Sequence, residues 1–280
     1  MAFSVNFKDD IIYYSADKLT AQPGVKHAFT TRFGGVSEGV YAALNLGFNR
    51  GDIRERVMEN YRIVCKALDL DIEKCVLSKQ VHGDTVRVIS PVDYGKGIFT
   101  PTDYEADALV TDIPGAVLII FTADCVPILL YDREKRVIAA VHAGWKSTVQ
   151  DIAGKAVETM VQRFGCRPEN ITAAIGHSIG KCCFETDGDV PDAVRALLGD
   201  AADEFIEPKG GKFHVDLKGI NRLLLTRRGV PSENIEVCEH CTMCMPETYW
   251  SHRYTKGVRG SQASISSLCE CRKCQANELY

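Results

Sequence analysis

The sequence lacks the features of a secreted or membrane-spanning protein. Its first ten residues, MAFSVNFKDD, do not show the basic stretch followed by an apolar stretch that is typical of a signal peptide. The longest clean apolar run, residues 116–121, is far shorter than the roughly 20 residues that cross a bilayer. We therefore expect a cytoplasmic protein without a membrane partner, in which most of the 12 cysteines are reduced.

Clustered positive charge, internal repeats, low-complexity segments and linkers are also missing. Acidic and basic residues are mixed along the chain and the formal net charge is -4, which argues against a nucleic-acid partner. Hydrophobic residues make up 45% of the 280 residues, as in ordinary globular proteins, so a large core is available. We predict one domain over residues 1–280, with a cysteine-rich tail at about residues 269–280.

Apolar patterns predict an α/β fold. Helical spacing extends from a capping Asp216 to Gly229, and a second helical stripe ends just before Gly165. Two more helices are expected at about residues 55–70 and 191–198. Buried strands are expected at residues 117–121, 126–131, 137–141 and 171–175, with shorter ones within residues 11–33, 76–77 and 86–89.

Three side chains within residues 79–145 form a candidate metal centre. His82, Cys125 and His142 each follow or end a predicted strand, and one thiolate with two imidazoles is a ligand set that zinc prefers. Three protein ligands leave the fourth tetrahedral position open for water or substrate. Copper in the same pocket is an alternative, because Cu²⁺ competes well for nitrogen and sulfur ligands.

Two other interpretations of these residues stay open. Cys125 could act as a nucleophile with His142 as its base, without any metal. Alternatively, the chain is a non-catalytic zinc-binding protein, and His177 or Cys183 closes the site as a fourth ligand.

Six motifs stand in a fixed order along residues 25–268. They are Gln80-Val81-His82-Gly83, Ala106-Asp107-Ala108, Ala123-Asp124-Cys125-Val126-Pro127-Ile128, His142-Ala143-Gly144-Trp145, Gly176-His177-Ser178-Ile179-Gly180-Lys181-Cys182-Cys183-Phe184-Glu185, and Cys241-Thr242 followed by Ser251-His252-Arg253. Together they resemble the YfiH or laccase-domain family. The resemblance implies a single layered α/β domain, in which mixed β-sheets are covered by helices, with metal ligands at His82, Cys125 and His142.

The same resemblance implies a zinc-dependent purine nucleoside phosphorylase, which splits adenosine, inosine or guanosine with phosphate. Adenosine deaminase and methylthioadenosine phosphorylase are associated activities of the family. Copper-dependent polyphenol oxidation is the alternative, although the paired His-x-His motifs of a laccase centre are absent from the sequence. The expected partners are purine nucleosides and phosphate, and the choice between monomer and homodimer stays open.

Further residues are candidates for binding and proton transfer. Arg32 and Lys146 are candidates to bind phosphate, because a polyanion needs cationic donors. Glu185 is the candidate carboxylate that moves a proton. Asp124 is a second candidate, or else a partner that orients a metal-bound histidine, and Trp145 is expected to be a packing residue.

The sequence departs from the family pattern in two places and adds cysteines. Position 177 is His where the family usually has Pro. Gly260-Ser261-Gln262 lacks the arginine that often follows this glycine, although Arg259 stands one residue before the glycine. Six cysteines with metal-ligand spacing form a candidate second metal site, for zinc or an iron-sulfur cluster: Cys238, Cys241, Cys244, Cys269, Cys271 and Cys274.

Overall fold

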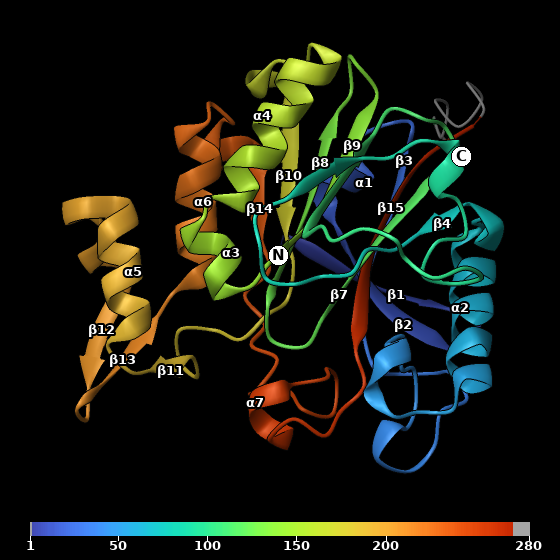
Figure 1. Cartoon of the computed structure of the whole chain (residues 1–280), viewed down its shortest axis with the longest axis horizontal. Helices are drawn as coiled ribbons and strands as arrows, with labels where there is room; N and C mark the ends of the chain where they lie inside the picture. The colour runs from blue at the N-terminus through green and yellow to red at the C-terminus, as the bar shows by residue number, and fades with distance from the viewer. Residues whose placement is uncertain (1, 271–280) are drawn as a thin grey trace.

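Two six-stranded β-sheets pack face to face in the computed structural model, which describes residues 2–270 (Figure 1). The first sheet has the order β1 (Phe3–Lys8), β2 (Ile11–Ala16), β3 (Val25–Thr30), β15 (Gln262–Leu268), β7 (Val117–Thr122), β4 (Cys75–Val76). The second has the order β14 (Ile235–Val237), β10 (Ile171–Ile175), β8 (Val126–Asp132), β9 (Val137–Ala143), β6 (Ala108–Thr111), β5 (Val86–Val88). Both sheets contain parallel and antiparallel pairs.

Helices cover the outer faces of both sheets (Figure 1). The short helices are α1 (Asp17–Thr20), α3 (Trp145–Val149) and α7 (His252–Thr255), and the longer ones are α2 (Arg54–Leu68), α4 (Ile152–Phe164), α5 (Asp189–Leu198) and α6 (Leu217–Arg227). A small third sheet, with the order β11 (Glu185–Thr186), β13 (Lys212–Val215), β12 (Ile206–Lys209), lies beside α5. No described helix is long and apolar enough to span a membrane.

Strand alternation produces three separate hydrophobic layers. On β7, Leu118 and Ile120 point into the layer between the two sheets, whereas Ile119 points toward α2. On β8, Leu129 faces the other sheet and Ile128 faces the layer under α4 and α6. Because both faces of these strands are covered, their sequences are continuously apolar, as expected for buried strands.

The structure confirms the predicted layered α/β fold with mixed sheets covered by helices. The capping Asp216 accepts a hydrogen bond from the Gly219 amide, and Gly165 ends α4 with a left-handed φ of 67°. Seven strands were not predicted: β1, β6, β11, β12, β13, β14 and β15. The last of these matters most, because β15 lies between β3 and β7 in the middle of the first sheet, more than 200 residues from β3 in sequence.

Candidate metal centre

The structure brings His82, Cys125 and His142 together. One ligand atom from each residue lies within 4.8 Å of the others, and the Cys125 Sγ is 3.6 Å from the His82 Nε2. His142 is buried, Cys125 is half-buried and His82 is exposed, so the group opens to solvent on one side.

The three residues meet where the chain crosses from one sheet to the other. His82 lies in the loop that leaves β4 in the first sheet and reaches β5 in the second. Cys125 lies in the tight bend between β7 and β8, which also belong to different sheets. His142 on β9 pairs with Pro127 on β8, two residues beyond Cys125. Two crossings and the end of β9 therefore make one site from distant segments.

A single buried carboxylate, that of Asp107, positions both histidines. Its Oδ1 lies 2.7 Å from the His142 Nδ1, which leaves the His142 Nε2 free to face the ligand group. The same carboxylate accepts hydrogen bonds from the backbone amides of Val81, His82 and Gly83 at 3.2, 3.0 and 2.8 Å. It thereby holds His82 at a left-handed φ of 60°, which is costly for a residue other than glycine.

The charges of the three groups are strongly linked. Burial opposes ionisation of the Cys125 thiol, but His142 and His82 outweigh it and lower its pKa to about 6. Burial likewise opposes protonation of His142, but the Cys125 sulfur and Asp107 raise its pKa to about 9. Burial would raise the pKa of Asp107 as well, yet hydrogen bonds from His142 and the backbone lower it. The pocket therefore stabilises a thiolate, the form of cysteine that binds metals.

Asp124 has a different role from the one expected for it. Its carboxylate accepts hydrogen bonds from the Thr242 hydroxyl at 2.5 Å and from the Arg253 amide at 2.7 Å, and its carbonyl accepts one from the Ile179 amide. It adopts a positive φ of 92°, directly before Cys125. Asp124 therefore fixes the bend that contains Cys125, whereas Asp107 orients the ring of His142.

The space between the ligands fits a metal ion. A Cβ added at Gly144 would lie 2.5 Å from the His82 Cδ2 and 3.2 Å from the Cys125 Sγ, so only glycine lets these side chains approach. The donor set is one sulfur and two imidazole nitrogens, which suits zinc and copper. Among residues 2–270, no further Cys, His, Asp or Glu joins the group, so protein ligands occupy three positions.

A cavity of about 720 Å³ adjoins the ligands. His82, Cys125 and His142 form part of its wall, and aromatic side chains form another part, namely Phe48, Phe99 and Phe121. Three arginines also line it: Arg50, Arg54 and Arg259. No Asp or Glu of the described residues lines it, so the cavity carries positive charge beside the ligands.

Arg259 is the unusual member of this set. Its side chain is buried, and its Nη1 donates hydrogen bonds to the Gly260 carbonyl and the Ser261 hydroxyl. Its Nε has no hydrogen-bond partner among the described residues, and no described carboxylate forms an ion pair with it. Burial and the nearby Arg50 lower its pKa to about 10. Arg259, which precedes Gly260 in the sequence, therefore reaches the cavity.

The other predicted site residues lie elsewhere. The Arg32 guanidinium donates to the carbonyls of Ala42 and Pro246 and packs 4.1 Å from the centroid of the Trp250 ring, so it connects two loops. Lys146 is exposed, with its Nζ 5.6 Å from the centroid of the Trp145 ring. Glu185 is exposed on β11, with its Oε2 3.9 Å from the His214 Nε2. None of these three lines the cavity.

The two candidates for a fourth ligand also lie outside the group. His177 is fully buried and stacks on Tyr249 with ring centroids 4.1 Å apart, and neither of its ring nitrogens has a hydrogen-bond partner within residues 2–270. Cys183 belongs to a separate group of cysteines. The half-buried Trp145 starts α3 and packs against the core beneath it, as expected for a packing residue.

The chain is similar to known proteins over most of its length. The model of a family described as multi-copper polyphenol oxidoreductase laccase matches residues 26–269. The chain belongs to this family. The match covers all three metal-ligand candidates and Arg259.

Named members of this laccase-domain family are similar over most of their length. Purine nucleoside phosphorylase YlmD of Geobacillus stearothermophilus is 36% identical over 240 residues, covering 85% of this chain and 88% of the relative. Purine nucleoside phosphorylase of Deinococcus radiodurans is 41% identical over 245 residues, covering 87% and 89%. The crystal structure of Bacillus licheniformis hypothetical protein YfiH superposes with a TM-score of 0.89 at 32% identity, covering 95% and 98%.

Proposed function

We propose that this chain is a zinc-dependent purine nucleoside phosphorylase whose centre is formed by His82, Cys125 and His142. The names of its family relatives give the reaction class. The observation that carries the proposal is the position of Arg259, a buried guanidinium that forms no ion pair with a described carboxylate, on the wall of the cavity that contains the three ligands. A buried charge of this kind is costly unless an anion binds to it.

His82, Cys125 and His142 would hold the ion, with Asp107 fixing the ring orientation of His142. When bound, zinc supplies a Lewis-acidic centre that stabilises negative charge developing beside it. The protein keeps this side of the cavity fixed through the hydrogen bonds of Asp107 and Asp124, so little reorganisation is needed during the reaction.

Phosphate is assigned to the arginine side of the cavity. Arg259 is pre-positioned by its hydrogen bonds to Gly260 and Ser261, and Arg50 is close enough to lower its pKa. Two guanidinium groups that repel one another are both stabilised by a polyanion between them, and guanidinium groups bind phosphate oxygens in pairs. In this proposal Arg259 and Arg50 bind phosphate, in place of Arg32 and Lys146.

The nucleoside is assigned to the aromatic side. Phe48, Phe99 and Phe121 line the cavity and offer flat apolar surfaces for a purine. In phosphorolysis a phosphate oxygen forms a bond to the ribose C1′ while the bond from C1′ to the purine nitrogen breaks, and the electron pair leaves with the base. Placing the two reactants in contact supplies a large part of the rate enhancement. The proposal assigns no proton transfer to Glu185, which lies outside the cavity.

One second activity is favoured by a specific observation. A relative named adenosine deaminase RL5 is 35% identical over 236 residues, covering 82% of this chain and 88% of the relative. Deamination of adenosine would use the same three ligands and a water in place of phosphate. Copper in the same ligands, with oxidation of phenols, is the third candidate activity, because the family description names copper.

Product analysis separates these activities. Zinc-loaded protein is incubated with adenosine, inosine or guanosine, with and without inorganic phosphate, and the products are separated by chromatography. We expect free base and ribose 1-phosphate in equal amounts, formed only when phosphate is present. Inosine formed from adenosine without phosphate would indicate deamination. Copper-loaded protein that oxidises phenols while the zinc form splits no nucleoside would contradict the proposal.

An arginine comparison tests the phosphate assignment. Arg259→Gln removes the buried charge, and we expect the KM for phosphate to rise by roughly 10-fold or more, in line with about 1.5–3 kcal/mol for a charge-assisted hydrogen bond. Lys146→Gln is the matched control, because this exposed cation lies near the centre in sequence but does not line the cavity. A larger KM effect for Lys146→Gln than for Arg259→Gln would contradict the assignment.

A further inference from the structure

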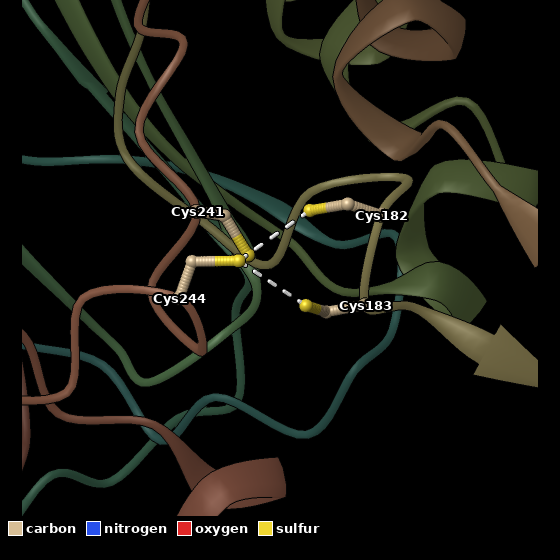
Figure 2. A group of neighbouring side chains, drawn as sticks. All are labelled: Cys182, Cys183, Cys241 and Cys244. Atoms are coloured by element: carbon tan, nitrogen blue, oxygen red, sulfur yellow. Dashed lines mark hydrogen bonds between the residues drawn. The ribbon is translucent and has the colours of Figure 1, made fainter.

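Four cysteines outside the catalytic centre form a second compact group. They are Cys182, Cys183, Cys241 and Cys244, and their Sγ atoms all lie within 4.8 Å of one another. Figure 2 shows the sulfurs of two loops facing each other: Cys182 and Cys183 come from the turn between β10 and β11, and Cys241 and Cys244 follow β14. The chain thus brings together two pairs that are about 60 residues apart in sequence.

The group differs from the one expected from the sequence. Cys241 and Cys244 belong to it, but Cys238 does not: it is buried, and its carbonyl accepts a hydrogen bond from the Lys218 Nζ. Cys269 follows β15 and is also outside the group, while Cys271 and Cys274 lie outside the described residues. Cys182 and Cys183 complete the set, and their adjacency gave no spacing signal for a metal site.

The sulfur separations match a single tetrahedral ion. Four thiolates at about 2.3 Å from one zinc ion lie about 3.8 Å from each other. Here the Cys244 Sγ is 3.7 Å from the Cys182 Sγ and 3.4 Å from the Cys183 Sγ. All four thiols are free, and these distances exceed the roughly 2.05 Å of a disulfide bond. An iron-sulfur cluster would spread the four sulfurs over separate irons, which this compact group does not provide.

One amide donor and two cationic side chains lie close to the group. The Gly180 amide donates to the Cys241 Sγ at 3.2 Å. The Arg253 guanidinium donates to the Cys183 carbonyl, and the buried Lys218 ammonium donates to the His240 carbonyl next to Cys241. These cations would offset the net negative charge of four thiolates on a divalent ion.

We propose that Cys182, Cys183, Cys241 and Cys244 bind one zinc ion in a closed structural site. Four protein ligands leave no open position, in contrast to the three-ligand centre. The ion would join the loop after β10 to the loop after β14. The loop after β14 also contacts the bend that contains Cys125. Thr242, which lies between Cys241 and Cys244, donates a hydrogen bond to Asp124, the neighbour of Cys125. The second ion would thus stabilise the position of Cys125 without contacting substrate.

Metal stoichiometry tests this site independently of any activity. Protein purified under reducing conditions is analysed for zinc by mass spectrometry of the element, and we expect about two zinc ions per chain. A protein with Cys241→Ser and Cys244→Ser together should retain one ion, as should His142→Ala, which affects only the other centre. Cys238→Ala is the matched control, because Cys238 lies in the same segment but outside the group, and it should retain both ions.

Cobalt substitution keeps the test valid even if the double cysteine variant fails to fold. Metal-stripped His142→Ala protein is titrated with Co²⁺ alone. We expect one equivalent to give the intense sulfur-to-cobalt charge-transfer band and visible bands of a tetrahedral tetrathiolate site. One zinc ion per wild-type chain that His142→Ala removes completely would overturn the proposal. A disulfide between Cys183 and Cys244 in protein kept under reducing conditions, found by peptide mapping, would overturn it as well.

Discussion

Replacing Asp107 by Asn should damage both histidine ligands at once. The substitution keeps the size of the side chain but replaces one acceptor oxygen by an NH₂ donor. In the structure the Asp107 Oδ1 is hydrogen-bonded to the His142 ring and the His82 amide, whereas Oδ2 accepts hydrogen bonds from the amides of Val81 and Gly83. Either orientation of the new amide leaves one of these two sets facing a donor.

Both orientations weaken metal binding. If the NH₂ group faces His142, the ring must keep its proton on Nε2, the nitrogen that faces the metal ligands. If it faces Val81 and Gly83, the loop is no longer held and His82 can leave its left-handed conformation. Loss of such a supporting carboxylate lowers metal affinity by roughly 10- to 100-fold, which equals about 1.4–2.7 kcal/mol. In that second orientation the amides of Val81 and Gly83 lose their acceptor, which should also lower the free energy of unfolding by roughly 2–5 kcal/mol.

Asp132→Asn is the matched control for this substitution. Asp132 is fully buried and also accepts hydrogen bonds from three backbone amides, those of Glu134, Lys135 and Arg167. It ends β8, whereas Cys125 precedes the start of that strand, so the two lie about 20 Å apart. Zinc affinity is measured by competition with a chromophoric chelator, and stability by urea unfolding of metal-free protein. Equal zinc affinities of Asp107→Asn and Asp132→Asn at similar stability would refute the reasoning.

Three further predictions concern the centre and the core. Gly144→Ala should weaken zinc binding by roughly 10-fold or more, because the added methyl group would overlap His82. Gly188→Ala is the control and should leave zinc affinity unchanged, because its added Cβ would have its nearest neighbour at 3.9 Å. Alkylation of Cys125 in metal-free protein, followed by peptide mass spectrometry, should titrate with a midpoint near pH 6, and zinc should block it; a midpoint near pH 9 would contradict the assigned pairing with His142. His177 is buried, and its pKa is lowered to about 3. The unfolded chain takes up this proton below about pH 6.5 and the folded protein does not. The contribution of His177 to the free energy of unfolding should therefore be complete above about pH 6.5 and fall by about 2 kcal/mol on going to about pH 5. Urea unfolding at both pH values should show this difference between wild type and His177→Phe, and identical pH dependence in the two proteins would disprove it.

Local patterns were sufficient for much of the fold. The helices α2, α4 and α6 repeat apolar residues with helical spacing, and the strands β7, β8 and β9 are continuous apolar runs, so each element is encoded within its own segment. The strand β15 was missed because its sequence, QASISSL, is rich in serine. Those serines are buried through hydrogen-bonded pairing with β3 and β7, which a local pattern does not reveal.

The sequence could select His82, Cys125 and His142 as candidate ligands because their side chains are typical of metal sites, and the structure brings them together. The residues that support them depend on tertiary contacts. One cysteine and two histidines at strand ends already indicate a zinc ligand set. Asp107 could not be chosen over Asp124 from sequence, since both are aspartates beside strands and only the folded chain shows which one meets His142. The role proposed for Arg259 could not be predicted either, because only the folded chain shows that this side chain is buried and forms no ion pair with a described carboxylate.

The most direct test of the catalytic assignment is a zinc titration of phosphorolysis. Metal-stripped protein carrying Cys244→Ser, which weakens the proposed structural site, is supplied with increasing zinc at saturating phosphate, and ribose 1-phosphate formation from inosine is followed. We expect a rate that rises in proportion to zinc and levels off near one equivalent, and no rate at any zinc concentration when Cys125→Ala is added. Full phosphorolysis by the metal-stripped protein, or by the protein that also carries Cys125→Ala, would contradict a centre built from His82, Cys125 and His142.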